Sequence, residues 1–153
     1  MLSVDPGLQG TGWALWDHTG CLIKVGVITP SQTKPLFSRC RWIANKLQEI
    51  EFDNKDFLVV CEYPKFFDSA MGQMVARRGD LVKLATLIGV IAGRCKSSSF
   101  MPVGVNEWKG TLPKTVVERR IRAIIGEKKC VRLGIKTHAW DAVGIGLYKQ
   151  GRF

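Results

Sequence analysis

Apolar and polar residues follow two different periods along the chain, and each period predicts a different kind of element. Short runs that are apolar, or that alternate between apolar and polar positions, are typical of strands when turn residues bound them. Such runs predict strands over residues 1–6, 13–16, 21–28, 57–61 and 99–105. Longer stretches with apolar residues three and four positions apart predict helices over residues 33–50, 70–93, 114–125 and 137–149.

The connections between these elements indicate a layered α/β fold. Residues 7–12 and 17–20 are too short to hold a crossover helix, so the first three strands should form an antiparallel meander. The run Phe57–Cys61 is apolar at every position, which is typical of a central strand that is buried on both faces. Later strands alternate with helices, and this order favours one α/β domain over residues 1–153.

Length and composition agree with one globular domain. The chain has 153 residues, 46% of them hydrophobic and 24% charged, and a domain commonly has about 100–200 residues. It contains no run of 18 or more apolar residues, so no membrane span is expected. The segment Met1–Asp5 lacks the basic and apolar regions of a secretion signal. Five dispersed cysteines without a Cys-x-x-Cys motif fit reduced, mostly buried thiols, and we expect a cytoplasmic protein.

The positive charge is concentrated in the last sixty residues. Residues 1–93 hold 10 Lys and Arg against 9 Asp and Glu, whereas residues 94–153 hold 13 against 4, out of a formal net charge of +10. A clustered basic surface favours a polyanionic partner, because each neutralised phosphate releases condensed counterions. A solvated basic face and an anionic membrane surface are the alternatives. Nucleic acid is favoured, because no segment shows a clean basic amphipathic helix.

Three acidic residues stand at the borders of apolar segments, where a carboxylate is costly unless it is paired or bound to metal. Asp5 ends the first predicted strand, Glu62 follows the apolar run, and Asp141 lies within the last predicted helix. If the first and fourth strands are neighbours in the sheet, Asp5 and Glu62 end side by side. Converging carboxylates are suited to hard cations such as Mg²⁺ or Mn²⁺, and His138 lies three positions before Asp141 on the same helix face.

Each of these residues also has a purely structural interpretation. Asp5 belongs to an Asp-Pro-Gly sequence, which is a strong turn signal by itself. Asp141 would be favoured by the helix dipole if Thr137 is the N-cap of the last helix, and Glu62 could simply end a strand. The metal site is favoured because all three acids fall at element ends, where a cleft is expected.

The glycine-rich segment Gly7–Gly12 invites comparison with phosphate-binding loops. It lacks the Gly-Lys-Ser/Thr ending and the following helix that such loops have, so this signal is weak. We expect a hairpin turn that allows a DNA backbone or a metal ion to approach closely.

Taken in order, the motifs resemble the RuvC-type Holliday junction resolvases of the RNase H-like superfamily. The resemblance rests on Leu-Ser-Val-Asp5-Pro-Gly-Leu-x-Gly-Thr-Gly-Trp-Ala, on Val-Val-Cys-Glu62, on His138-x-x-Asp141-Ala and on the helical stretch 71–93. It covers nearly the whole chain. The Asp-x-Gly opening is shared with sugar kinases and Hsp70-like ATPases, but those proteins need two such domains and much longer chains.

The resemblance implies a three-layer fold with a central five-stranded mixed sheet, in which three strands are antiparallel and two are parallel, flanked by helices. It also implies a homodimer with two active sites on one DNA-binding face. By position, two Mg²⁺ or Mn²⁺ ions would be held by Asp5, Glu62, His138 and Asp141. The family has Asp or His at the position of His138, so this residue is a tolerated variant that can alter the metal preference.

Further residues correspond by position to groups of the family that contact DNA. Lys109 and Lys114 resemble two lysines at the scissile phosphate, although the loop between them is shorter here. Phe66 and Phe67 resemble the segment whose aromatic ring inserts at the junction centre, and packing in a dimer or in the core is the alternative for them. Additional candidates for DNA contacts are the arginine pairs Arg77, Arg78, Arg119 and Arg120.

The activity that the resemblance implies is metal-dependent resolution of four-way DNA junctions in recombination and repair. Two symmetric nicks would leave 5′-phosphate ends. The alternatives are a broader structure-selective nuclease that acts on flaps and forks, and a non-catalytic relative that binds branched DNA. A compact chain of this kind fits the cytoplasm of a prokaryotic or phage-infected cell.

Overall fold

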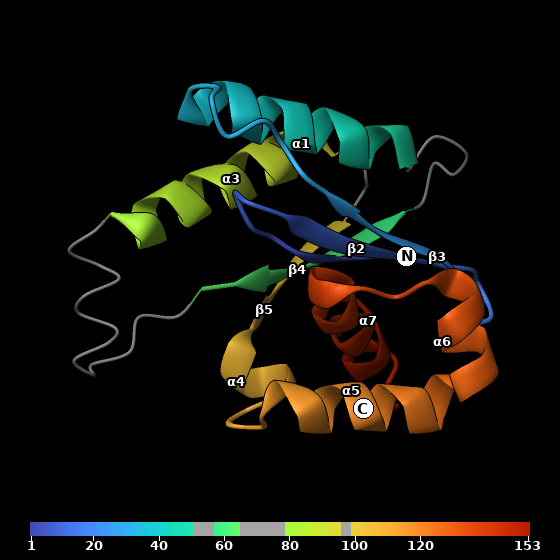
Figure 1. Cartoon of the computed structure of the whole chain (residues 1–153). Coiled ribbons are helices and arrows are strands. Elements are labelled where there is room, and N and C mark those ends of the chain that lie inside the picture. Colours follow the sequence, from blue (N-terminus) through green and yellow to red (C-terminus); the bar gives the residue numbers. More distant parts are fainter. Residues whose placement is uncertain (51–56, 65–78, 96–98) are drawn as a thin grey trace.

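The fold is built around one mixed sheet of five strands. The computed structural model describes residues 1–50, 57–64, 79–95 and 99–153 (Figure 1). The strands lie in the order β3-β2-β1-β4-β5. The first three strands are antiparallel, whereas β4 runs parallel to β1 and β5 runs parallel to β4. Their bounds are β1 Leu2–Asp5, β2 Thr11–Trp16, β3 Leu22–Ile28, β4 Leu58–Tyr63 and β5 Ser99–Gly104. The predicted meander and the implied mixed sheet are both confirmed.

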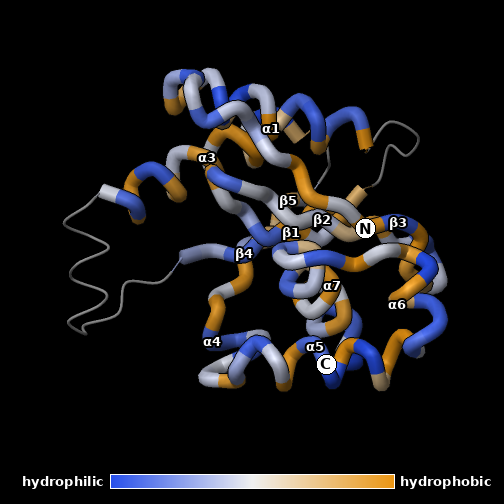
Figure 2. The backbone as a smooth tube through the Cα atoms, in the orientation of Figure 1, coloured by the Kyte–Doolittle hydropathy of each residue, from blue (hydrophilic) through white to orange (hydrophobic). Residues whose placement is uncertain are grey.

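Helices cover both faces of this sheet and complete three layers (Figure 1). On one face lie α1 and α3, and on the other lie α5, α6 and α7. Figure 2 shows hydrophilic and hydrophobic residues alternating along α1 and α5, as expected for helices with one face on a core. The helix bounds are α1 Leu36–Ile50, α3 Asp80–Arg94, α4 Val105–Trp108, α5 Lys114–Ile125, α6 Glu127–Leu133 and α7 Thr137–Lys149.

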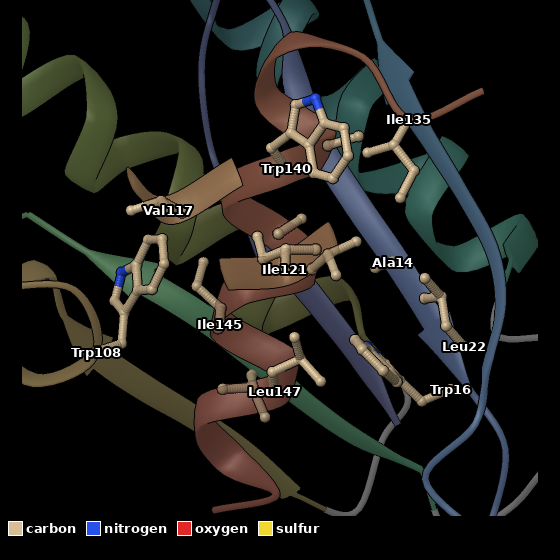
Figure 3. Close-up of a cluster of buried hydrophobic side chains, with 14 of the residues drawn as sticks. Ala14, Trp16, Leu22, Trp108, Val117, Ile121, Ile135, Trp140, Ile145 and Leu147 are labelled. Carbon is tan, nitrogen blue, oxygen red and sulfur yellow. The ribbon is translucent and has the colours of Figure 1, made fainter. Parts of the chain in front are cut away.

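Each face of the sheet has its own buried hydrophobic cluster. Side chains of the central strands alternate between the two clusters: Val59 and Cys61 pack toward α1 and α3, whereas Val60 packs toward α7. The run in β4 is therefore buried on both faces, as predicted. Figure 3 shows the cluster on the α7 side, where Trp108 lies beside Val117 and Ile145 at one end and Trp16 lies near Leu147 at the other.

Several elements differ from the prediction for local physical reasons. The short helices α4 and α6 were not predicted, because four and seven residues are too few to display a helical period. The helix expected over 70–93 is described only from Asp80, and residues 70–78 of that prediction lie outside the described residues. Gly79, which has a φ of 68°, is the residue preceding the described helix. None of the described helices is long and apolar enough to span a membrane.

The start of α7 also differs from the prediction. Its N-cap is Lys136 rather than Thr137, no side chain caps it, and its first turn contains no acidic residue. Thr137 instead has a φ of 31°, which is a strained conformation for a β-branched residue. Asp141 therefore lies beyond the first turn, and the helix dipole does not account for this acid. All five cysteines are free, as predicted, and Cys40, Cys61 and Cys130 are buried.

Candidate active site

Asp5 and Glu62 meet at one edge of the sheet because their strands are parallel neighbours. Val4 pairs with Cys61, so the next residue of each strand comes to the same level. The alternation of side chains along the two strands turns Asp5 and Glu62 toward the face that α7 covers, the face shared by Val60. Asp5 is 9% exposed, so its carboxyl group is nearly removed from water. The predicted convergence of the first two acids is confirmed.

Helix α7 brings His138 to the same place because glycines occupy both the segment between β1 and β2 and the start of β2. A Cβ atom on Gly12 would lie 2.1 Å from the backbone oxygen of His138, and one on Gly10 would lie 3.2 Å from its ring Cδ2. Only glycine permits so close an approach of two backbones. The expected close approach thus exists, but the group that approaches these glycines is the first turn of α7. The approach of a DNA backbone or a metal ion to this turn stays a prediction.

The four predicted ligands lie together with one lysine. His138 Nδ1 is 3.2 Å from Asp5 Oδ2, and the Asp141 carboxylate lies one turn further along the same face of α7. Lys109, the residue that follows α4, extends its ammonium group into the site. Its Nζ atom is 3.4 Å from Asp141 Oδ1 and 4.0 Å from Glu62 Oε2. The structure therefore places Lys109 at the centre of the predicted acidic cluster.

Crowding of the acids perturbs their proton affinities. Burial and the neighbouring Asp5 carboxylate raise the pKa of Glu62 to about 7, from an ordinary value of 4.5. Burial also raises the pKa of Asp5, although its hydrogen bond with His138 opposes the rise. The same hydrogen bond raises the pKa of His138. Carboxyl groups that are held close together in a dry site against their own repulsion are a common feature of functional centres.

By its chemistry, this donor set fits a hard divalent cation. Three carboxyl groups and an imidazole can supply the oxygen and nitrogen ligands that Mg²⁺ and Mn²⁺ accept. Within the described ranges, however, no three His, Cys, Asp or Glu side chains lie in an arrangement that would hold a metal ion. Glu62 and Asp141 are engaged with the Lys109 ammonium group instead. Metal binding would require these carboxylates to exchange the lysine for the metal.

The remaining predicted residues lie around this centre or outside the described residues. Lys114 is the first residue of α5 and is exposed, and its charge lies close enough to oppose the rise in the pKa of His138. Arg119 and Arg120 are exposed on α5, and the Arg120 guanidinium is 6.0 Å from the centre of the Phe153 ring. Four predicted DNA contacts lie outside the described residues: Phe66, Phe67, Arg77 and Arg78.

Trp108 belongs to the site but was not predicted as part of it. Its indole Nε1–H donates a hydrogen bond of 2.8 Å to Glu62 Oε2. The Lys109 ammonium lies 4.7 Å from the centre of the same ring. A signal was available in the sequence, because a buried tryptophan needs an acceptor for its N–H and this one directly precedes Lys109.

Comparisons with known proteins identify solved structures that share this fold. No family model and no curated protein match the chain, but solved structures do. The RuvC of T. thermophilus in complex with Holliday junction substrate matches with a TM-score of 0.67 at 19% identity, over 99% of this chain and 97% of that chain. Another Thermus thermophilus RuvC structure matches with a TM-score of 0.63 at 20% identity, over 99% and 98%. The Fowlpox virus resolvase in complex with its substrate Holliday junction DNA matches with a TM-score of 0.57 at 16% identity, over 99% of both chains.

These likenesses give the chain the RNase H-like fold of RuvC. The sheet order and the helical layers agree with that assignment. The resemblance drawn from the sequence motifs is thereby confirmed at the level of the fold.

The raised pKa of Glu62 predicts a pH-dependent stability difference. The unfolded carboxyl group loses its proton near pH 4.5 and the folded one near pH 7, so stability from this group is present below pH 4.5 and is lost as the pH rises to about 7. Compared with Glu62→Gln, the metal-free wild type should lose up to about 3 kcal/mol of its free energy of unfolding between pH 4.5 and pH 7. This follows because each tenfold change in proton affinity corresponds to about 1.4 kcal/mol. Urea unfolding in EDTA at several pH values measures it.

A matched control removes a carboxylate elsewhere. Glu49 is exposed on α1 and pairs with Lys46, so Glu49→Gln should follow the wild type over the same pH range. If the Glu62→Gln and wild-type curves stay parallel between pH 4.5 and pH 7, Glu62 is not a crowded, buried carboxyl group.

Proposed function

We propose that this protein is a divalent-metal-dependent endonuclease that resolves four-way DNA junctions by paired symmetric nicks, leaving 5′-phosphate ends. The observation that carries the proposal is the convergence of Asp5, Glu62, His138 and Asp141 with Lys109 at one sheet edge. This convergence occurs on the fold of RuvC, whose T. thermophilus structure contains Holliday junction substrate. Residues 1–153 act as one nuclease domain in this proposal.

The metal-binding residues are Asp5, Glu62, His138 and Asp141. Two Mg²⁺ or Mn²⁺ ions, when bound there, supply a Lewis acid for the phosphodiester and an activated water. The chain itself contributes the charge and the shape of the site. Asp5 orients the His138 ring through their hydrogen bond, and burial of Asp5 and Glu62 keeps bulk water from the carboxylates.

Lys109 and Lys114 contribute positive charge where a phosphate would enter. In the metal-free protein the Lys109 ammonium balances Glu62 and Asp141. With cations held by these carboxylates, the Lys109 ammonium would be free to contact the scissile phosphate. Lys114 starts α5 at the exposed rim of the site, in a position to contact the neighbouring backbone.

Basic residues of the C-terminal helices bind the duplex arms of the junction. Residues 94–153 carry 13 Lys and Arg against 4 Asp and Glu, and α5 exposes Arg119 and Arg120. Contacts with phosphates hold duplex arms without reading their sequence. A homodimer would place two such sites on one junction, and Phe66 or Phe67 would stack on an unpaired base at its centre. We assign the reaction to recombination and repair in a prokaryotic or phage-infected cell.

The role of α5 predicts a change in salt dependence. The double substitution Arg119→Gln/Arg120→Gln should weaken junction binding and reduce the slope of log Kd against log salt by about 1–2, because each lost phosphate contact removes about 0.9 from the slope. Arg41, exposed on α1, is the matched control, and Arg41→Gln should leave the slope unchanged. Fluorescence anisotropy with a labelled junction between 50 and 200 mM salt, roughly the range over which such contacts are lost, measures both. A double variant with the wild-type slope would remove α5 from the DNA interface.

A panel of labelled substrates tests the proposed function against its two alternatives. Four-way junction, fork, flap and linear duplex are incubated with Mg²⁺ or Mn²⁺ at equal protein concentration. Junction resolution predicts cleavage of the four-way junction well above all other substrates. Comparable cleavage of forks and flaps would favour the broader nuclease, and binding without cleavage under every condition would favour a non-catalytic relative.

A further inference from the structure

The indole of Trp108 contacts both kinds of charged group in the site. One edge of the ring donates the 2.8 Å hydrogen bond from Nε1 to Glu62 Oε2. The face of the same ring lies 4.7 Å from Lys109 Nζ. Lys109 in turn lies between the carboxylates of Glu62 and Asp141. A single rigid side chain is thus in contact with a carboxylate and with an ammonium group of the site.

The indole ring of Trp108 is tightly packed on the side away from Glu62. Trp108 is 3% exposed, and Figure 3 shows it at the end of the cluster beside Val117 and Ile145. A Cβ atom on Gly144 of α7 would lie 2.4 Å from Trp108 Cζ3, so the absence of a side chain there makes room for the ring. The ring of Phe153 packs edge-on at a centroid distance of 5.6 Å. The indole therefore has little freedom to turn away from Glu62.

We propose that Trp108 is a positioning residue for cleavage, which fixes the orientation of the Glu62 carboxylate and of the Lys109 ammonium. This inference rests on the proposed function. Glu62 occupies the penultimate position of β4, and among the described residues Trp108 is its side-chain hydrogen-bond donor. A carboxylate free to rotate would present its oxygens to a cation in several orientations. A misplacement of about 1 Å in a catalytic group can cost a hundredfold in rate.

The direct test removes the N–H group and keeps a buried ring. Trp108→Phe should lower kcat for junction cleavage by about 10- to 100-fold, because a hydrogen bond to a charged group and its orientation are lost. The Kd for the junction in EDTA should stay within about twofold of wild type, because binding rests on exposed Lys and Arg residues. A structural role alone would lower the amount of folded protein without changing kcat per folded molecule, which circular dichroism and active-site titration resolve.

A second pair of variants displaces Trp108 in one case and, as a matched control, Trp16 in the other. Gly144→Ala would push a methyl group into Trp108, and Gly146→Ala would push one into Trp16, at 2.4 Å in both cases and from the same helix. The indole N–H of Trp16 donates its hydrogen bond to Ser3 Oγ, at 2.8 Å, and not to Glu62. Gly144→Ala should therefore lower kcat as Trp108→Phe does. Gly146→Ala should lower the melting temperature and leave kcat per folded molecule within about twofold of wild type.

A spectroscopic measurement tests the contact without metal, DNA or turnover. The chain has five Trp residues, and each gives an indole resonance in a ¹H–¹⁵N correlation spectrum. The Trp108 resonance is assigned by its loss in Trp108→Phe, and its proton should be shifted downfield by the carboxylate. Glu62→Ala should move this resonance most among the five, whereas Glu49→Ala should move none of them.

The outcomes separate the two claims. The positioning role would be overturned if Trp108→Phe kept the wild-type kcat, or if the Trp108 indole resonance did not shift in Glu62→Ala. Either result would leave the proposed function intact. A wild-type protein that cuts no junction would overturn the proposed function together with any role in cleavage, while the spectrum still decides whether Trp108 holds Glu62.

Discussion

Asp5→Asn should abolish junction cleavage while leaving junction binding in place. The substitution keeps the size of the side chain and an oxygen that can face His138, but it removes the most buried negative charge of the site. Ligand loss from a metal centre removes several kcal/mol of transition-state stabilisation, so a loss on the order of 10³-fold or more in rate is expected. The Kd in EDTA should not weaken, because the contacts with phosphates come from Lys and Arg residues.

The control for this prediction is Asp17→Asn. Asp17 lies beyond the other end of β2, where its carboxylate accepts hydrogen bonds from Thr19 and Cys21 in an exposed turn, and Asn serves equally well in such turns. Single-turnover cleavage of a labelled junction should therefore match wild type for Asp17→Asn. Wild-type cleavage by Asp5→Asn would show that the site has been assigned to the wrong residues.

Gly12→Ala should cost more folding stability than alanine at any other glycine that the structure describes. Its new Cβ would lie 2.1 Å from the carbonyl oxygen of His138 and 2.4 Å from the carbonyl carbon, both of them backbone atoms that no rotamer change can move. Overpacking of this kind costs about 3 kcal/mol or more when the neighbour is rigid. Because the displaced element is the first turn of α7, the loss of stability should be accompanied by loss of cleavage.

Gly89→Ala is the same chemical change, but it should raise the free energy of unfolding instead of lowering it. Gly89 lies within α3, and a Cβ atom there would meet nothing within 4 Å. Replacing glycine by alanine inside a helix should stabilise the protein by about 0.5–1 kcal/mol. Urea unfolding of both variants measures the two effects. A Gly12→Ala variant as stable as wild type would mean that the first turn of α7 does not pack against the start of β2.

The parts of the fold that the sequence predicted well are those with a strong local signal. The predicted bounds of α5 and α7, residues 114–125 and 137–149, agree with the structure, because both helices show a regular spacing of apolar residues. The meeting of Asp5 with Glu62 also followed from local information. Once an apolar strand is central and parallel to the first one, their carboxyl ends must lie together.

The parts that escaped prediction depend on contacts between distant segments. Trp108 reaches Glu62 across 46 positions in the sequence, and it does so from α4, a helix of four residues. The role of Gly12 depends on where α7 lies, which no local pattern reveals. Lys109 was predicted at the site by resemblance, but its ion pairs with Glu62 and Asp141 depend on where α4 ends, which its own sequence neighbours do not reveal.

Mapping the nicks on a mobile four-way junction tests the central claim most directly. Each of the four strands is labelled in turn, and the products formed with Mg²⁺, with Mn²⁺ and with EDTA are resolved to the nucleotide. Junction resolution predicts metal-dependent nicks at symmetry-related positions on two opposite strands, with 5′-phosphate ends that ligase can seal. Unpaired or asymmetric nicks, or no metal-dependent nick with either ion, would contradict it.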